Sequence, residues 1–299
     1  MLLALVVLAT SACGDGNSGS GGGTVSADGS STVGPYVTSA AEGFRDESGT
    51  NVTVGISGTG GGFERFCRGE TDLSNASRTI DEDEVAICEE NGVEYLELQV
   101  ANDALTVVVN TANDWATCLT VEELNAIWKP GSTATSWQDV RESFPDDPLE
   151  LFGPGTDSGT FDYFTDAING EEGASRTDYQ ASEDDNVIVQ GVKGTAGGLG
   201  YFGFSYFEEN QGSLKAVEID GGSGCVAPSA ESTQAGEYVP LARPLFVYAK
   251  TDALARSEVE DFLRYMLENE ASIAERARFV PLNETQIEEN LRKLDEATG

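Results

Sequence analysis

The stretch LFGPGTDSGTFDYF, residues 151–164, joins an apolar run to an aromatic-flanked segment through a loop of glycine, proline, serine, threonine and aspartate. The apolar run predicts a strand (Leu149–Phe152), and the segment after the loop predicts a helix (Thr160–Ile168). Such a loop holds either a nucleophile or an anion at the positive end of the helix dipole. Strand, loop and helix recur in this order along the chain, which favours an α/β protein with parallel sheets.

Three further loops share this composition and this place between a predicted strand and a predicted helix. They are DGSSTVGP (28–35), SGTGGGF (57–63) and NASRT (75–79). Glycine lets the backbone approach a ligand closely, and hydroxyl groups add hydrogen-bond donors. One such loop is also consistent with an ordinary turn. Four of them together predict a cage of donors for an oxyanion.

The remaining segments extend the same pattern. Helices are predicted to begin near Gly62 or Phe63 and to cover about 81–90, and two strands are predicted at 94–100 and 104–110. A helix at 121–128 precedes the opening stretch. The segment NVIVQGVKGTAGGLGYFGFSYF (186–207) predicts a helix, a glycine loop and a strand. PLARPLFVYAK (240–250) predicts a last strand before a helical C-terminal part.

Length and charge limit the function. A chain of 299 residues has room for roughly two compact units. Its 52 acidic and 17 basic residues give a net charge of −35. This charge repels nucleic acid and anionic lipid headgroups, which proteins bind through clustered Lys and Arg. The simplest role of the acidic surface is solubility.

The first residues, MLLALVVLATSACG (1–14), contain an apolar run that is too short to span a bilayer and has the length of a signal-peptide core. The small residues before Cys13 resemble the lipobox of bacterial lipoproteins, in which the cysteine receives lipid. The glycine and serine run 14–23 predicts a flexible tether. We therefore expect an exported protein, periplasmic or on the outer face of the membrane, with a lipid anchor at Cys13. An ordinary secretory signal with an unrelated cysteine is the alternative.

With Cys13 lipidated, four cysteines remain: Cys67, Cys88, Cys118 and Cys225. An even number is typical of disulfides in an oxidising compartment. Three pairings are open. We favour Cys67–Cys88, which is local, together with Cys118–Cys225, which would staple one domain. No C-x₂-C pair and no histidine occur, so we expect no zinc site.

Two charged residues in the loops indicate anion binding. Arg78 could clamp two anion oxygens with its planar fork, or form a surface ion pair with a carboxylate. Asp157 would repel a fully ionised ligand but accept a hydrogen bond from a protonated one, which favours hydrogen phosphate over sulfate. Asp157 could instead cap its helix.

The sequence does not favour an enzyme. A chain without histidine has no Ser-His-Asp triad, and Ser158 does not stand in a G-x-S-x-G motif. Neither S-x-x-K nor the nucleotide P-loop pattern occurs. No carboxylate pair stands out among the 52 acidic residues. We therefore expect a binding protein without a cofactor.

The motifs DGSSTVGP, SGTGGGFERFCRGETDLSNASR, GPGTDSGTFDYF and GGLGYFGFSYF, in this order, resemble the phosphate-binding proteins of bacterial high-affinity phosphate ABC transporters. The resemblance covers about residues 24–294. It implies the type II periplasmic-binding-protein fold, with two α/β lobes, two hinge strands and phosphate in the cleft between the lobes. It also implies a monomer that closes on phosphate and delivers it to ABC permease subunits. Lobe one would comprise 24–107 plus 245–299, and lobe two 108–244.

The resemblance also implies a ligand set, which is carried over loop by loop. The aspartate that accepts the phosphate proton in the best-known members falls where Arg78 stands, and their cleft arginine falls near Pro154. Asp157 is therefore our candidate for the proton acceptor. The expected phosphate ligands are Ser31, Thr32, Val33, Ser57, Thr59, Arg78, Asp157, Ser158, Gly159 and Thr160. A receptor for sulfate or molybdate, or a secreted phosphatase-like hydrolase on the same scaffold, are the alternatives.

Overall fold

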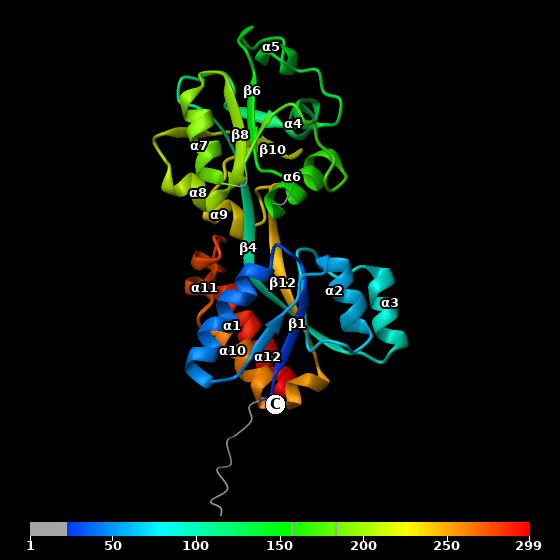
Figure 1. Cartoon of the computed structure of the whole chain (residues 1–299). Coiled ribbons are helices and arrows are strands. Elements are labelled where there is room, and N and C mark those ends of the chain that lie inside the picture. Colours follow the sequence, from blue (N-terminus) through cyan, green and yellow to red (C-terminus); the bar gives the residue numbers. More distant parts are fainter. Residues whose placement is uncertain (1–22, 157, 183) are drawn as a thin grey trace, which may run out of the picture.

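The computed structural model describes residues 23–156, 158–182 and 184–299, which form two lobes joined at a narrow waist (Figure 1). Each lobe is a sheet covered by helices, so the predicted two-lobed α/β fold is confirmed. Cys13, most of the tether and Asp157 lie outside the described residues. None of the helices in the described ranges is both long and apolar enough to cross a membrane.

Lobe one contains the two ends of the described chain. Its strands lie in the order β2 (Val52–Val54), β1 (Val25–Gly29), β3 (Leu73–Ala76), β12 (Ala242–Lys250) and β4 (Tyr95–Asn110). The first three are parallel, whereas β12 runs antiparallel to both β3 and β4. The helices are α1 (Gly34–Ser48), α2 (Gly58–Cys67), α3 (Glu82–Glu90), α10 (Ser257–Glu268), α11 (Glu270–Arg276) and α12 (Glu284–Thr298), with a 3₁₀ turn at Asp252–Ala255.

Lobe two continues the same sheet beyond the waist. The second half of β4 pairs with β8 (Gly198–Gly203) and β9 (Leu214–Ala216), and β6 (Glu150–Gly153) and β7 (Gln180–Ala181) follow β8. A small separate sheet has the order β11 (Cys225–Val226), β10 (Glu218–Asp220) and β5 (Cys118–Thr120). The helices are α4 (Val121–Trp128), α5 (Trp137–Val140), α6 (Gly159–Asn169), α7 (Asp185–Gly194), α8 (Phe204–Glu209) and α9 (Ala230–Gln234).

Local sequence signals set the ends of the helices. Pro35 stands in the first turn of α1, where a missing N–H costs nothing, and Gly49 ends the helix with φ 76°. Ser158 caps α6 by accepting the Thr160 N–H, and Gly170 ends it with φ 78°. The strand, loop and helix predicted at 149–168 are therefore confirmed.

Two details of the predicted elements are wrong. Helix α2 begins at Gly58 rather than near Gly62 or Phe63, so the glycines predicted to form a loop lie in its first turns. Of these glycines, Gly62 is required by packing, since a Cβ there would lie 2.5 Å from the Gly29 Cα. The two strands predicted at 94–100 and 104–110 are one continuous strand, β4. Pairing with β12 continues through the intervening residues, with Pro244 opposite Asn102 and Arg243 opposite Asp103.

Strands β4 and β12 cross the waist side by side and form the hinge (Figure 1). The core of lobe one ends at Ala101 on β4, and that of lobe two begins at Leu105. Leu245 of β12 belongs to the core of lobe one, and Leu241, the residue before β12, belongs to the core of lobe two. The lobe limits of 24–107, 245–299 and 108–244 stay a prediction.

Both favoured disulfides are present. Cys67–Cys88 joins α2 to α3 in lobe one, and Cys118–Cys225 joins β5 to β11 in lobe two. Each bridge therefore stabilises one lobe and leaves the hinge free to move.

Candidate functional site

The loop after β1 enters the waist from lobe one. Gly29 has φ 138°, and a Cβ there would lie 2.2 Å from the carbonyl oxygen of Asn75, so only glycine fits this close approach. Ser31 and Thr32 then lie at the N-terminus of α1, where backbone N–H groups carry partial positive charge. The Val33 N–H points back to Ser30 Oγ at 3.4 Å, and the Val33 side chain is buried.

The start of α2 and the loop after β3 lie together beside this first loop. Thr59 Oγ1 is 3.1 Å from Ser77 Oγ and accepts the Ser77 N–H at 3.3 Å. Ser57, Thr59, Ser77 and Arg78 line one cavity of about 410 Å³ with the loop 30–32. Three of the four predicted loops therefore meet in lobe one.

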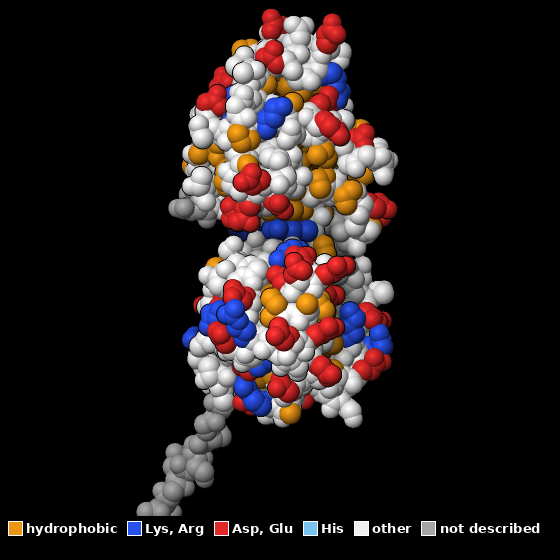
Figure 2. All heavy atoms as spheres, turned by 90° about the vertical axis from the view of Figure 1, so that its right-hand side faces the viewer, with side chains coloured by type: hydrophobic (Ala, Val, Ile, Leu, Met, Phe, Trp, Pro, Cys, Tyr) orange, Lys and Arg blue, Asp and Glu red, His pale blue; other side chains and the backbone are white. Residues whose placement is uncertain are grey.

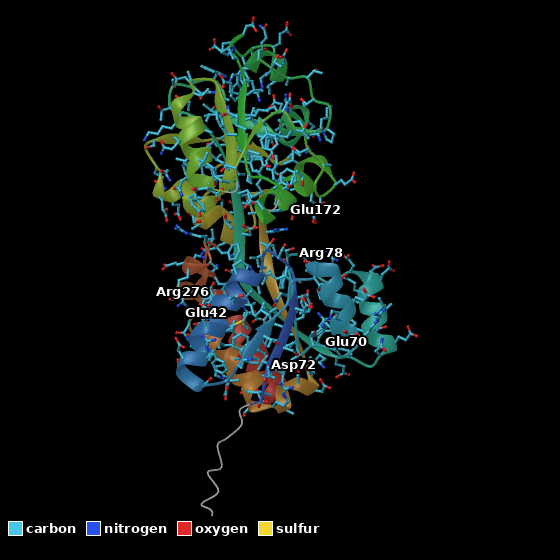
Figure 3. The ribbon with its side chains drawn as sticks, in the orientation of Figure 1. Glu42, Glu70, Asp72, Arg78, Glu172 and Arg276 are labelled. Carbon is cyan, nitrogen blue, oxygen red and sulfur yellow. A yellow bond between two sulfur atoms is a disulfide. The ribbon has the colours of Figure 1, made fainter. Side chains whose placement is uncertain are left out.

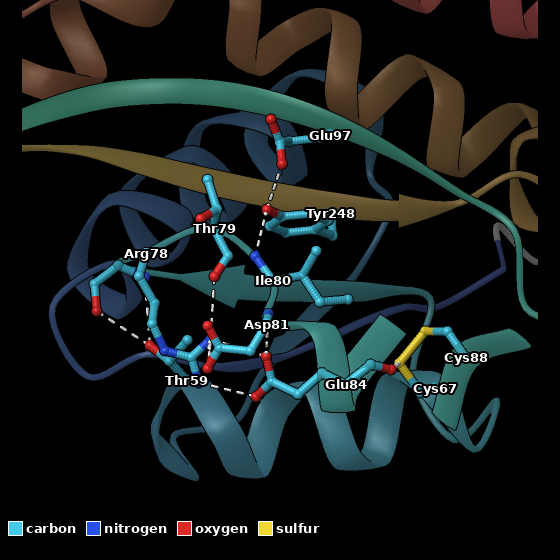
Figure 4. A network of polar contacts seen from close by, with 11 residues as sticks. Thr59, Cys67, Arg78, Thr79, Ile80, Asp81, Glu84, Cys88, Glu97 and Tyr248 are labelled. Carbon is cyan, nitrogen blue, oxygen red and sulfur yellow. Dashed lines mark hydrogen bonds and ion pairs between the residues drawn. A yellow bond between two sulfur atoms is a disulfide. The ribbon is translucent and has the colours of Figure 1, made fainter. Parts of the chain in front are cut away.

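Arg78 is held by acidic neighbours (Figure 4). Its two terminal nitrogens donate to the two oxygens of Glu84 at 2.8 and 2.9 Å, and one of them is 3.1 Å from Asp81 Oδ2. The hydrogen bond to Glu84 raises the pKa of Arg78, so the guanidinium stays charged. Arg78 thus forms the ion pair with carboxylates that the sequence predicts as the alternative to anion binding. It also lines the cavity.

The fourth loop reaches the waist from lobe two. Ser158, Gly159 and Thr160 form the first turn of α6 and line a second cavity of about 190 Å³, which also contains Ser31 and Thr32. A Cβ on Gly159 would lie 3.3 Å from Thr32 Oγ1. The polar loops of the two lobes are therefore nearly in contact at this point.

The pair Arg243 and Asp103 lies at the centre of the waist, and sequence reasoning missed it. The two residues are opposite each other on the hinge strands, with Arg243 Nη2 3.3 Å from Asp103 Oδ2. The same nitrogen donates to Thr32 Oγ1 at 3.1 Å, and the guanidinium lies 3.6 Å from the centre of the Tyr163 ring. Burial raises the pKa of Asp103, and Arg243 opposes this shift.

Arg243 therefore contacts lobe one through Thr32, lobe two through Tyr163 and the hinge through Asp103. Its side chain is only 18% exposed, and that of Asp103 is 10% exposed. A sequence signal existed, since Arg243 is one of 17 basic residues and falls inside a predicted strand. The strand register that places it opposite Asp103 was not readable from the chain.

Acidic residues of lobe two face the Arg78 side of the cleft. Asp162, Asp166 and Glu172 line the larger cavity, and Glu172 lies across the waist from Arg78 (Figure 3). Burial and the nearby Glu172 raise the pKa of Asp162. Figure 2 shows basic side chains at the waist, with acidic side chains above and below them. Arg78 and Arg243 thus bring positive charge into a cleft whose lobe-two wall is acidic.

The structure thus brings most of the predicted site residues to the waist. Ser31 and Thr32 line both cavities, Ser57, Thr59 and Arg78 line the larger one, and Ser158, Gly159 and Thr160 line the smaller one. Within the described ranges, no three residues of the metal-ligating types are grouped so that they could hold an ion.

Two lobes, two hinge strands and a polar cleft define a substrate-binding protein of the periplasmic type II class. Residues 15–270 match the family described as PBP superfamily domain, so the chain belongs to this family.

Individual relatives agree with the family assignment. The chain is 46% identical to protein SphX of a Synechocystis species, over 94% of this chain and 84% of that protein. It is 38% identical to the phosphate-binding protein PstS of Staphylococcus saprophyticus, over 96% and 90% of the two chains. A crystal structure described as a possible phosphate binding protein from Planctomyces limnophilus is 46% identical. It has a TM-score of 0.89, with 93% of this chain and 99% of that chain covered.

Proposed function

We propose that this protein is a receptor that captures inorganic phosphate outside the cytoplasm and delivers it to an ABC permease. The observation that carries the proposal is the meeting of the Ser31–Thr32 loop with the Ser158–Thr160 loop, from opposite lobes, next to Arg243, whose guanidinium contacts Thr32. Relatives at 34–38% identity are named phosphate-binding proteins, which supports phosphate as the ligand. A receptor of this kind performs no chemical reaction, so no catalytic residue is proposed.

The proposed contacts are hydrogen bonds to the phosphate oxygens. The N-termini of α1, α2 and α6 supply partial positive charge, and the hydroxyl groups beside them donate to the anion. The proposed ligands are Ser31, Thr32, Val33, Ser57, Thr59, Arg78, Ser158, Gly159 and Thr160, to which we add Arg243. Arginine binds phosphate oxygens well; the Nε and Nη2 of Arg243 donate to Asp103 and Thr32, so the donors proposed for phosphate are those of Nη1.

Recognition of the phosphate proton requires a carboxylate at the site. Asp157 remains a candidate from the sequence. Asp103 is a second candidate, because it lines the smaller cavity with Thr32 and Ser158. Either carboxylate would accept a hydrogen bond from hydrogen phosphate. The same carboxylate would repel sulfate, because sulfate has no proton to donate at neutral pH.

We further propose that the mature protein is exported and anchored by lipid at Cys13. Lobe one would comprise 24–107 and 245–299, and lobe two 108–244. The protein would act as a monomer. Phosphate bound between the lobes would favour the closed form, in which lobe surfaces are presented together to the permease. The division of the two apolar cores across β4 and β12 supports this hinge.

Calorimetric titration with phosphate, arsenate, sulfate and molybdate tests the ligand. We expect phosphate, and arsenate as its closest analogue, to bind far more tightly than sulfate. Tight molybdate or sulfate binding without phosphate binding would favour another oxyanion receptor. Release of phosphate from a phosphate ester during incubation would favour the hydrolase.

A further inference from the structure

The segment 277–282, between α11 and α12, contacts the second lobe at a place outside the two hinge strands. It belongs to lobe one, and it is fixed to the hinge by Val280, which exchanges two backbone hydrogen bonds of 2.9 Å with Asn102 of β4. Val280 is also buried against Ala104 and against Phe204 of α8 in lobe two. The segment therefore lies where the hinge strand and the second lobe meet.

Arg278 carries most of the polar contact to lobe two. Its guanidinium forms an ion pair with Glu209 of α8 and lies 5.0 Å from the centre of the Tyr206 ring. Its carbonyl oxygen accepts the Ser205 hydroxyl at 3.2 Å. One helix further on, Gln234 of α9 donates to the carbonyl oxygen of Pro281 at 2.7 Å.

The backbone of Arg278 ends helix α11. Its φ is 66°, and among the described residues it is the single non-glycine residue with a positive φ. The Phe279 N–H donates to the Ala274 carbonyl oxygen at 2.9 Å and the Arg278 N–H to that of Glu275 at 3.2 Å, which is the hydrogen-bond pattern of a helix C-terminal cap with one left-handed residue. The cap fixes the backbone at this position, and from it the side chain and the carbonyl group both reach α8.

The position of this contact determines how the lobes can move. In Figure 1, α8, α9 and α11 lie on one side of the hinge strands, and α2 and α6 lie on the other. The larger cavity, lined by Arg78 and Glu172, lies on the α2 and α6 side. Arg278 and Tyr206 of α8 line the smaller cavity together with Ser158. Two adjacent strands alone permit both bending and twisting, whereas a third contact to one side of them restricts the motion to fewer directions.

We propose that Arg278 is a positioning residue of the hinge, which ties lobe one to α8 so that the cleft opens and closes only on the Arg78 side. The Arg278 contact narrows the range of lobe orientations in the ligand-free protein. In the ligand-free protein, the polar loops of the two lobes therefore already lie close to the arrangement that binds the anion. The entropic cost of fixing the lobes on binding is then smaller.

The experiment measures the distance between spin labels on Glu82→Cys, at the start of α3 in lobe one, and Glu171→Cys, just after α6 in lobe two. Both sites are exposed, and α3 and α6 lie on the α2 side of the hinge strands. Arg278→Gly removes the side chain and tolerates the positive φ, and Glu209→Gln removes only the ion pair. Arg292→Gly is the control for Arg278→Gly, since Arg292 is similarly exposed and paired with Glu289 and Glu296 within α12.

We expect both hinge variants to broaden the distance distribution of the ligand-free protein. The charge-reversed pair Arg278→Glu with Glu209→Arg should narrow it again. An unchanged distribution in Arg278→Gly and Glu209→Gln would overturn the proposal, whatever the protein binds.

The effect on affinity rests on the proposed function. Phosphate affinity should fall about two- to fivefold in Glu209→Gln, the range expected of an exposed ion pair, with no fall in the control. Glu209→Gln is the variant that decides this point, because Arg278 itself lines the smaller cavity and Arg278→Gly would also remove any direct contact with the anion. A broadened distribution with unchanged phosphate affinity would overturn the claim that the contact prepares the site. If the parent protein bound no phosphate, the distance measurement would still test the hinge, and only the proposed function would fail.

Discussion

Replacing Arg243 by Met should abolish most of the phosphate affinity. The side chain keeps its apolar stem but loses the guanidinium that touches Thr32 and Asp103. Hydrogen bonds to a charged group contribute about 1.5–3 kcal/mol, so the loss of one such group predicts a fall in affinity of up to about 100-fold. Arg243→Lys keeps the charge without the planar fork and should lose about tenfold.

Arg243→Met should also lower the free energy of unfolding. The role of Arg243 in stability can therefore be measured separately from its role in phosphate binding. Breaking a buried ion pair costs about 3–5 kcal/mol, and this slightly exposed pair should cost less, about 2–3 kcal/mol. The unpaired Asp103 carboxyl should then take up a proton more readily, because burial already raises its pKa. The double variant Asp103→Asn with Arg243→Met should recover most of the stability but not the affinity.

Titration calorimetry gives the affinity and urea unfolding gives the stability of each variant. Arg292→Met, an exposed change on α12, is the control for both measurements. Wild-type phosphate affinity in Arg243→Met would refute the reasoning, since the guanidinium that contacts Thr32 of lobe one and Tyr163 of lobe two is proposed as a main phosphate ligand.

Three further predictions concern Arg78, salt and pH. Arg78→Ala should weaken phosphate binding about tenfold, less than Arg243→Met, because Glu84 already holds both terminal nitrogens of Arg78; calorimetry showing unchanged affinity would remove Arg78 from the site. Affinity should change less than tenfold between low and moderate salt, since a net charge of −35 gives no long-range attraction; a tenfold fall would contradict this. Burial raises the pKa of Glu270 to about 7, so its charging destabilises the fold as pH rises from its ordinary pKa near 4.5 to about 7. Glu270→Gln should therefore match the wild type near pH 4.5 and exceed its unfolding free energy by at most about 3 kcal/mol at pH 8; an equal gap at both pH values would contradict the assignment.

The fold and the location of the site could be predicted because their signals are local. Each polar loop stands between an apolar run and an amphipathic segment, and the Ser158 cap and Gly170 follow directly from residue type. The disulfide preference was also right, because one pair is local and the other closes within one lobe.

The residues that sequence reasoning missed depend on register between distant strands. Arg243 and Asp103 are 140 positions apart and meet only because β12 pairs antiparallel with β4. The start of α2 was misplaced for a related reason. Its glycines suggested a loop, whereas they lie in the first turns of the helix, and the contact of Gly62 with Gly29 is visible only in three dimensions.

A comparison of phosphate with sulfate at neutral pH tests the central claim most directly. Both anions are tetrahedral and of similar size, but only phosphate retains a proton for a carboxylate of the site. We predict saturable binding of one phosphate per chain in calorimetry and no measurable displacement by a hundredfold excess of sulfate. Equal affinity for the two anions, or no heat with phosphate, would contradict a phosphate receptor.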